Sequence, residues 1–116
     1  MAYKDNTVAY GFGQMGSIHV AGTTLTTSNS VTGMENAVFC AITFLEDTVF
    51  ANSLAGLTPE NSSNLFPGGT GMVSAGIDAD GGAITGTESF PKGITIYGRW
   101  TSITLASGRI IAYVGY

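Results

Sequence analysis

Short runs of apolar and β-branched residues, separated by clusters of Gly, Asn and Ser, recur along this chain. The clearest runs lie at residues 7–12, 17–21, 37–45 and 48–51. Runs of this length and composition are typical of β-strands. The pattern predicts an all-β protein with antiparallel sheets, either a β-sandwich such as a jelly roll or a small barrel. We expect one domain over residues 1–116, because a chain of this length supports a single core.

The C-terminal part of the chain has the strongest strand pattern. Ile94 and Ile96 alternate with Thr95 and Tyr97, the alternation continues at Ile103 and Leu105, and Ser107-Gly108 supplies a tight turn. This predicts two or three antiparallel strands, the last over residues 109–114. Both faces of that last strand are largely apolar, so we expect one to meet the core and the other a partner. The last strand is also expected to pair with a neighbouring copy and so close an open sheet edge.

A glycine-rich stretch over residues 56–86 separates the two strand-rich halves. It contains PGGTG, DADGG and TGT, which favour turns, so we expect a long loop excursion. Within it, Thr58-Pro59-Glu60 resembles a helix start, but the Asn and Ser residues that follow are poor helix formers. At most one helical turn is expected there.

The charge content restricts the partners. Charged residues make up only 10% of the sequence, and the net charge is −4. Weak ionic repulsion favours association of copies, whereas an acidic balance without a basic stripe argues against nucleic-acid binding. The sequence has neither a leader-like N-terminus nor an apolar run long enough to cross a membrane, so we expect a protein made in the cytoplasm without a membrane partner.

Two short segments resemble ligand-binding motifs, but the residues that follow them do not complete either motif. GFGQMG, residues 11–16, has the glycines of a dinucleotide-binding turn, yet a β-branched segment follows where a helix is required. A glycine-rich hairpin or bulge is expected instead. Asp78 and Asp80 resemble the start of a calcium-binding loop, but the twelfth position of that loop is Ser89 rather than Glu. We therefore expect no cofactor and no metal.

The sequence also lacks a recognisable catalytic set. His19 is the only imidazole, and no Ser lies in a G-x-S-x-G motif. We expect His19 to be packed or at the surface, and Cys40, the only thiol, to be a small buried apolar residue. Glu46 and Asp47 are adjacent, so on an extended strand they would point to opposite faces, and we expect them to form a solvated bend. An enzyme is therefore not expected.

Aromatic side chains near the C-terminus are the better candidates for function. Tyrosine and tryptophan combine a large contact area with a polar tip, and arginine forms bidentate hydrogen bonds or stacks on rings. Their alternative role is packing in the β core. The candidates for a subunit or capsid interface are Tyr97, Arg99, Trp100, Tyr113 and Tyr116.

The run FPKGITIYGRWTSITLASGRIIAYVGY, residues 90–116, resembles the C-terminus of small structural proteins from tailed bacteriophages. The rest of the chain is similar only in being rich in Gly and Thr and poor in charge. The resemblance implies a capsid decoration protein, also called a cement protein, on the exterior of the virion. Such a protein would bind the major capsid protein and copies of itself, as a homotrimer, and would stabilise contacts between coat subunits.

Two other functions stay open at the level of sequence. A receptor-binding or adsorption module of a tail or head fibre would use residues 56–86 as a loop that faces the host. A lectin or an enzyme would place Trp100 with Asp78 and Asp80 in a sugar- or metal-dependent site. Copy number per particle separates decoration from a tail location, and calorimetry with calcium and sugars tests the lectin.

Overall fold

The computed structural model describes residues 16–29, 36–53, 56–60, 65–69, 85–86 and 88–115. These residues form two antiparallel β-sheets, so the predicted all-β fold is confirmed. The strand expected over residues 7–12, the glycines at positions 11 and 13 and most of the glycine-rich excursion lie outside the described residues.

The described strands divide into a six-stranded and a three-stranded sheet. The larger sheet has the order β1-β9-β3-β7-β2, with β5 also paired to β7, and the smaller has the order β6-β4-β8. Their bounds are β1 Ser17–Val20, β2 Thr26–Thr27, β3 Val38–Phe44, β4 Thr48–Phe50, β5 Leu57–Pro59, β6 Ser89–Phe90, β7 Thr95–Ile103, β8 Leu105–Ser107 and β9 Ile110–Gly115.

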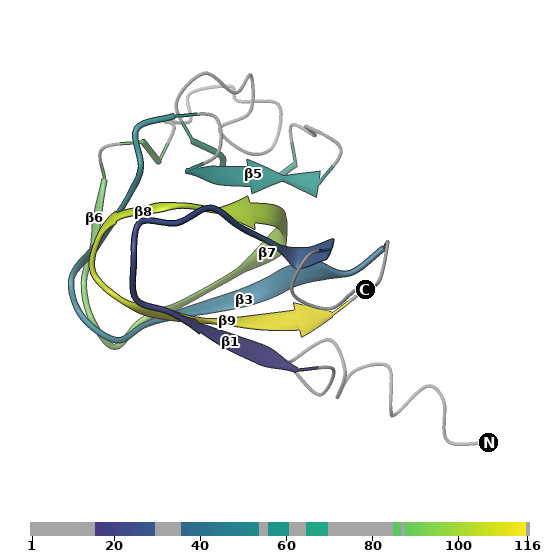
Figure 1. The fold of residues 1–116 in the computed structure, drawn as a ribbon, viewed down its shortest axis with the longest axis horizontal. Helices are drawn as coiled ribbons and strands as arrows, with labels where there is room; N and C mark the ends of the chain where they lie inside the picture. The colour runs from purple at the N-terminus through teal and green to yellow at the C-terminus, as the bar shows by residue number, and fades with distance from the viewer. Residues whose placement is uncertain are drawn as a thin grey trace.

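The larger sheet curls into a nearly closed barrel. In Figure 1, β1, β9 and β3 lie side by side along one wall, β5 lies across the opposite side, and β6 and β8 stand at one end. The chain passes from one sheet to the other through short connections, such as those between β3 and β4 and between β8 and β9. In the second connection Gly108 has a φ of +94° and lies so close to Thr48 that a Cβ atom would overlap it. The tight turn predicted at Ser107-Gly108 is not formed, because residues 108 and 109 make neither a turn nor a bend and lead from β8 in one sheet to β9 in the other.

The barrel interior is filled from alternate positions of paired strands. Side chains directly opposite each other on neighbouring strands lie on the same face. One such row contains Ile18, Ala112, Ile42 and Ile96, and a second contains Val20, Ile110 and Phe44. Ala112, Ile42, Ile110 and Phe44 are at most 1% exposed, and Val20 is 5% exposed. This inner face therefore supplies much of the hydrophobic core.

Three phenylalanines join the two sheets. Phe44 of β3 stacks on Phe90 of β6 with ring centroids 4.9 Å apart, and Phe50 of β4 meets both rings edge to face at 6.0 and 5.5 Å. Stacked and edge-to-face pairs at such distances add to the stabilisation that burial provides. This cluster holds the smaller sheet against the end of the barrel.

The structure corrects two details of the predicted local structure. Thr58 and Pro59 belong to β5 and pair with Ser102 and Trp100 of β7, so the expected helical turn does not begin there. Glu60, the next residue, is 3₁₀-helical, and residues 61–64 lie outside the described part of the chain. Proline is tolerated in β5 because this strand has only β7 as a neighbour among the described strands, and an edge strand can do without one backbone donor. The last strand, β9, is not an edge either, because it pairs with β1 on one side and β3 on the other.

Candidate protein-contact face

The outward-facing side of the barrel wall differs from the inner side in chemistry. The strand register places two rows of side chains there: Ser17, Tyr113, Ala41 and Tyr97 in the first, and His19, Ile111, Thr43 and Thr95 in the second. We call these eight residues the outer sheet face. They include no carboxylate, ammonium or guanidinium group. Their polar atoms are hydroxyls and one imidazole.

Exposure is concentrated at the two sides of this face. Tyr97 on β7 is 63% exposed, and Ser17 and His19 on β1 are also exposed. Ile111 and Tyr113 on the central strand β9 are half-buried, and Ala41, which lies between two tyrosines in its row, is only 4% exposed. Tyrosine rings with this exposure present apolar area and a hydrogen-bonding tip, as is common at protein interfaces.

Hydroxyl groups within the face are already ordered by the sheet. The Oγ1 atoms of Thr43 and Thr95, which lie opposite each other, are 2.8 Å apart, and either one can donate. Each hydroxyl has one donor hydrogen and two acceptor lone pairs, so the pair keeps capacity for further hydrogen bonds. The face therefore combines apolar area with hydrogen-bonding groups whose positions are fixed by paired strands.

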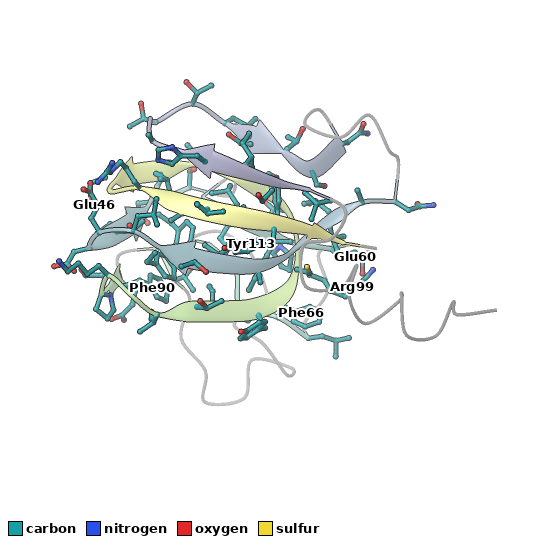
Figure 2. All side chains as sticks on the ribbon, turned by 90° about the horizontal axis from the view of Figure 1, so that it is seen from below. Glu46, Glu60, Phe66, Phe90, Arg99 and Tyr113 are labelled. Atoms are coloured by element: carbon teal, nitrogen blue, oxygen red, sulfur yellow. The ribbon has the colours of Figure 1, made fainter. Side chains whose placement is uncertain are left out.

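Ion pairs stand at opposite ends of the face. In Figure 2, which looks onto this side of the barrel, Tyr113 lies between Glu46 at one end and Glu60 with Arg99 at the other. Arg109 Nε donates to Glu46 Oε2 at 3.2 Å, and both side chains are about half exposed. Charge at the ends of the wall is therefore partly neutralised within the chain.

The pair at the other end has the better geometry. Arg99 donates from Nε to Glu60 Oε1 at 2.8 Å and from Nη2 to Glu60 Oε2 at 2.9 Å. These hydrogen bonds lower the pKa of Glu60 from its ordinary value of 4.5, against a smaller opposite effect of desolvation, and they raise the pKa of Arg99. The bidentate bonding expected of Arg99 is thus present, but its acceptor is a residue of the same chain.

The placement of Trp100 corrects one sequence-based assignment. Its side chain is 0% exposed and belongs to the core, so the interpretation of Trp100 as a contact residue is wrong. The indole fits inside because position 98 is glycine, where a Cβ atom would lie 2.7 Å from the ring. Its Nε1 donates to the Pro67 carbonyl at 2.8 Å, and Phe66 lies edge to face at 6.5 Å.

The other candidates divide between the face and its surroundings. Tyr97 and Tyr113 lie in the same row of the face, and Arg99 lies beside one end of it. Tyr116 lies outside the described residues, as do Asp78 and Asp80. The face also contains residues that the sequence analysis did not single out for a contact: Ser17, His19, Ala41, Thr43, Thr95 and Ile111. Alternation along each strand indicates which residues lie on the same face of that strand. Only the register between strands shows that these residues share one surface.

The remaining polar candidates have ordinary environments. His19 is exposed on β1, and Glu46 forms part of the expected bend between β3 and β4. Cys40 is only half-buried, not fully buried as expected, and its Sγ lies 3.5 Å from the Tyr113 carbonyl.

Within the described ranges, no group of three or more His, Cys, Asp or Glu side chains is arranged to hold a metal ion. The same part of the chain contains no helix with the length and apolarity needed to cross a bilayer.

Comparisons of the chain with protein-family models, with curated proteins and with solved structures find no significant match.

Proposed function

We propose that this chain is a decoration protein of a tailed bacteriophage, which binds the outer surface of the head shell and stabilises contacts between coat subunits. Its partners are the major capsid protein and other copies of itself, with a homotrimer as the expected assembly. The proposal assigns it a binding role rather than a catalytic one.

The outer sheet face is the observation on which this proposal depends most. It offers tyrosine and hydroxyl side chains on paired strands, with no carboxylate, ammonium or guanidinium group among them. Depletion of charge and enrichment of aromatic residues are the features that distinguish the centre of a protein interface from ordinary surface. A surface of this kind supports contact with protein better than contact with a charged ligand.

The sequence resemblance supports the same proposal. Residues 90–116 resemble phage structural proteins, and this segment contains β7 and β9, which supply half of the outer sheet face. The resembling segment thus overlaps the surface that is suited to protein contact.

The proposed stabilisation follows from mass action. A ligand that binds the assembled shell, but not separated coat subunits, lowers the free energy of the assembled state. An assembly of several copies that contacts two or more coat subunits also raises the effective concentration at the second contact, so each contact can be weak. Saturating decoration would therefore resist separation of coat subunits under the outward pressure of packaged DNA.

Binding to heads tests the proposal. Purified chain is added to heads that lack it, and the heads are sedimented and then heated. We expect saturable co-sedimentation and a higher temperature of head disruption. Heads that neither retain the chain nor gain thermal stability would contradict the proposal.

A further inference from the structure

We infer that the outer sheet face is the surface on which copies of this chain pack against one another. The inference rests on the proposed function, in which the chain assembles with other protein subunits, and it names a second copy as the occupant of this face.

Hydrogen-bonding chemistry makes the face complementary to itself. A carboxylate only accepts and an ammonium only donates, so a face built from either cannot bond to an identical face. A hydroxyl does both. The polar groups of the outer sheet face include the hydroxyls of Ser17, Thr43, Thr95, Tyr97 and Tyr113. Hydroxyls of one copy can therefore donate to and accept from hydroxyls of another copy, with no partner of different composition.

The distribution of charge favours the same occupant. Each copy has a net charge of −4, so bringing copies together costs repulsion unless the contact lies away from ionised groups. The outer sheet face meets this condition, because its eight residues have no carboxylate, ammonium or guanidinium group. The charged groups at its ends are paired within the chain, Glu46 with Arg109 and Glu60 with Arg99. A surface that binds a partner of opposite charge would instead contain charged side chains.

The two exposed sides of the face suit a ring of copies. His19 lies on β1 and Tyr97 on β7, with β9 and β3 between them. In a cyclic assembly each copy uses two different patches, one for each neighbour. The β1 side of one copy can thus pack on the β7 side of the next, which brings the half-buried Tyr113 close to the symmetry axis.

Single charges placed on either side of the face test the inference. His19→Asp and Tyr97→Asp change exposed side chains, and Leu25→Asp is the matched control because Leu25 is 52% exposed between β1 and β2, outside the face. Sedimentation velocity of the full chain at roughly 100 μM, where specific complexes of micromolar affinity are assembled, measures the oligomer. The thermal midpoint of each variant shows whether it is folded.

We expect an oligomer for the unaltered chain and for Leu25→Asp, and association weakened at least about tenfold in both face variants, because a like charge in an interface is unfavourable. A monomeric unaltered chain would overturn the inference. So would an oligomer that the folded face variants leave intact, or one that Leu25→Asp weakens equally.

Binding to heads, measured separately, distinguishes the two proposals. A monomer that decorates heads overturns only this inference, whereas an oligomer that depends on the face but does not bind heads overturns only the proposed function.

Discussion

At the scale of single residues, Gly98 determines where Trp100 lies. Tryptophan is too large to pack inside the barrel beside another side chain at position 98, where a Cβ atom would be 2.7 Å from two carbons of the ring. The indole cannot move aside easily, because it is fully buried and its Nε1 is bonded to Pro67. A missing side chain on one residue therefore turns a candidate contact residue into part of the core.

The substitution Gly98→Ala tests this dependence. Alanine is favoured over glycine in a strand by about 0.5–1 kcal/mol, but overpacking a rigid core costs about 1–3 kcal/mol. We expect a net loss of unfolding free energy. Urea unfolding followed by the fluorescence of Trp100, the only tryptophan, measures it. Gly22→Ala, where a Cβ atom meets nothing within 4 Å, is the control, and equal stability of the two variants would contradict the account.

The ion pair between Glu60 and Arg99 makes stability depend on pH. Because folding lowers the pKa of Glu60 below 4.5, its contribution is complete above the unfolded pKa and is lost as the pH falls through the lower, folded pKa. We expect Glu60→Gln to lower the unfolding free energy at pH 7 by about 0.5 kcal/mol, since side chains that are partly exposed are screened by solvent. The difference from the unaltered chain should shrink below pH 4.5.

Urea unfolding over a pH series measures this difference. Glu46→Gln is the matched control, because it removes a more exposed pair with one hydrogen bond and should have the smaller effect. A Glu60→Gln variant that matches the unaltered chain at every pH would show that the pair contributes nothing to folding.

At the scale of elements, β9 lies inside the larger sheet, so a truncation that removes this strand should remove part of the fold itself. Removing residues 109–116 deletes the strand between β1 and β3 together with Ile110, Ala112 and Val114 of the core. We expect the truncated chain to show no cooperative unfolding transition and no dispersion of amide signals in its NMR spectrum. A folded truncated chain would contradict the observed strand order.

The sequence predicts the strands better than their arrangement. The pattern of apolar residues gives β1, β3, β4, β7 and β9 close to their observed places, because alternation and β-branched content are local properties. The pattern of apolar residues does not predict where β-bulges occur. Between β3 and β9, Phe39 pairs with Val114 and Ala41 with Tyr113, so Cys40 is an extra residue that turns Phe39 inward.

The candidate site was predictable only in part for the same reason. Tyr97 and Tyr113 stand out as aromatic residues at alternating positions, but Thr43, Thr95 and His19 join them only through pairing between strands far apart in the sequence. The burial of Trp100 depends on Pro67 and Phe66, more than thirty residues away. No local pattern signals such a contact.

At the scale of the whole molecule, three features are mutually consistent. The chain has few charged residues, the outer sheet face has no carboxylate, ammonium or guanidinium group, and ion pairs lie at the ends of that face. Each of them reduces the repulsion between copies and leaves apolar and hydroxyl groups for contact with protein. The proposed role on a phage head makes use of all three, because decoration requires many identical copies to bind close together on one lattice.

Imaging of the purified phage particle that contains this chain tests that role most directly. The account predicts density for the barrel in many copies on the outside of the head, in register with the coat lattice, with the outer sheet faces of neighbouring copies turned toward each other. Density confined to a few sites on a tail or fibre, or no density on the particle, would contradict it.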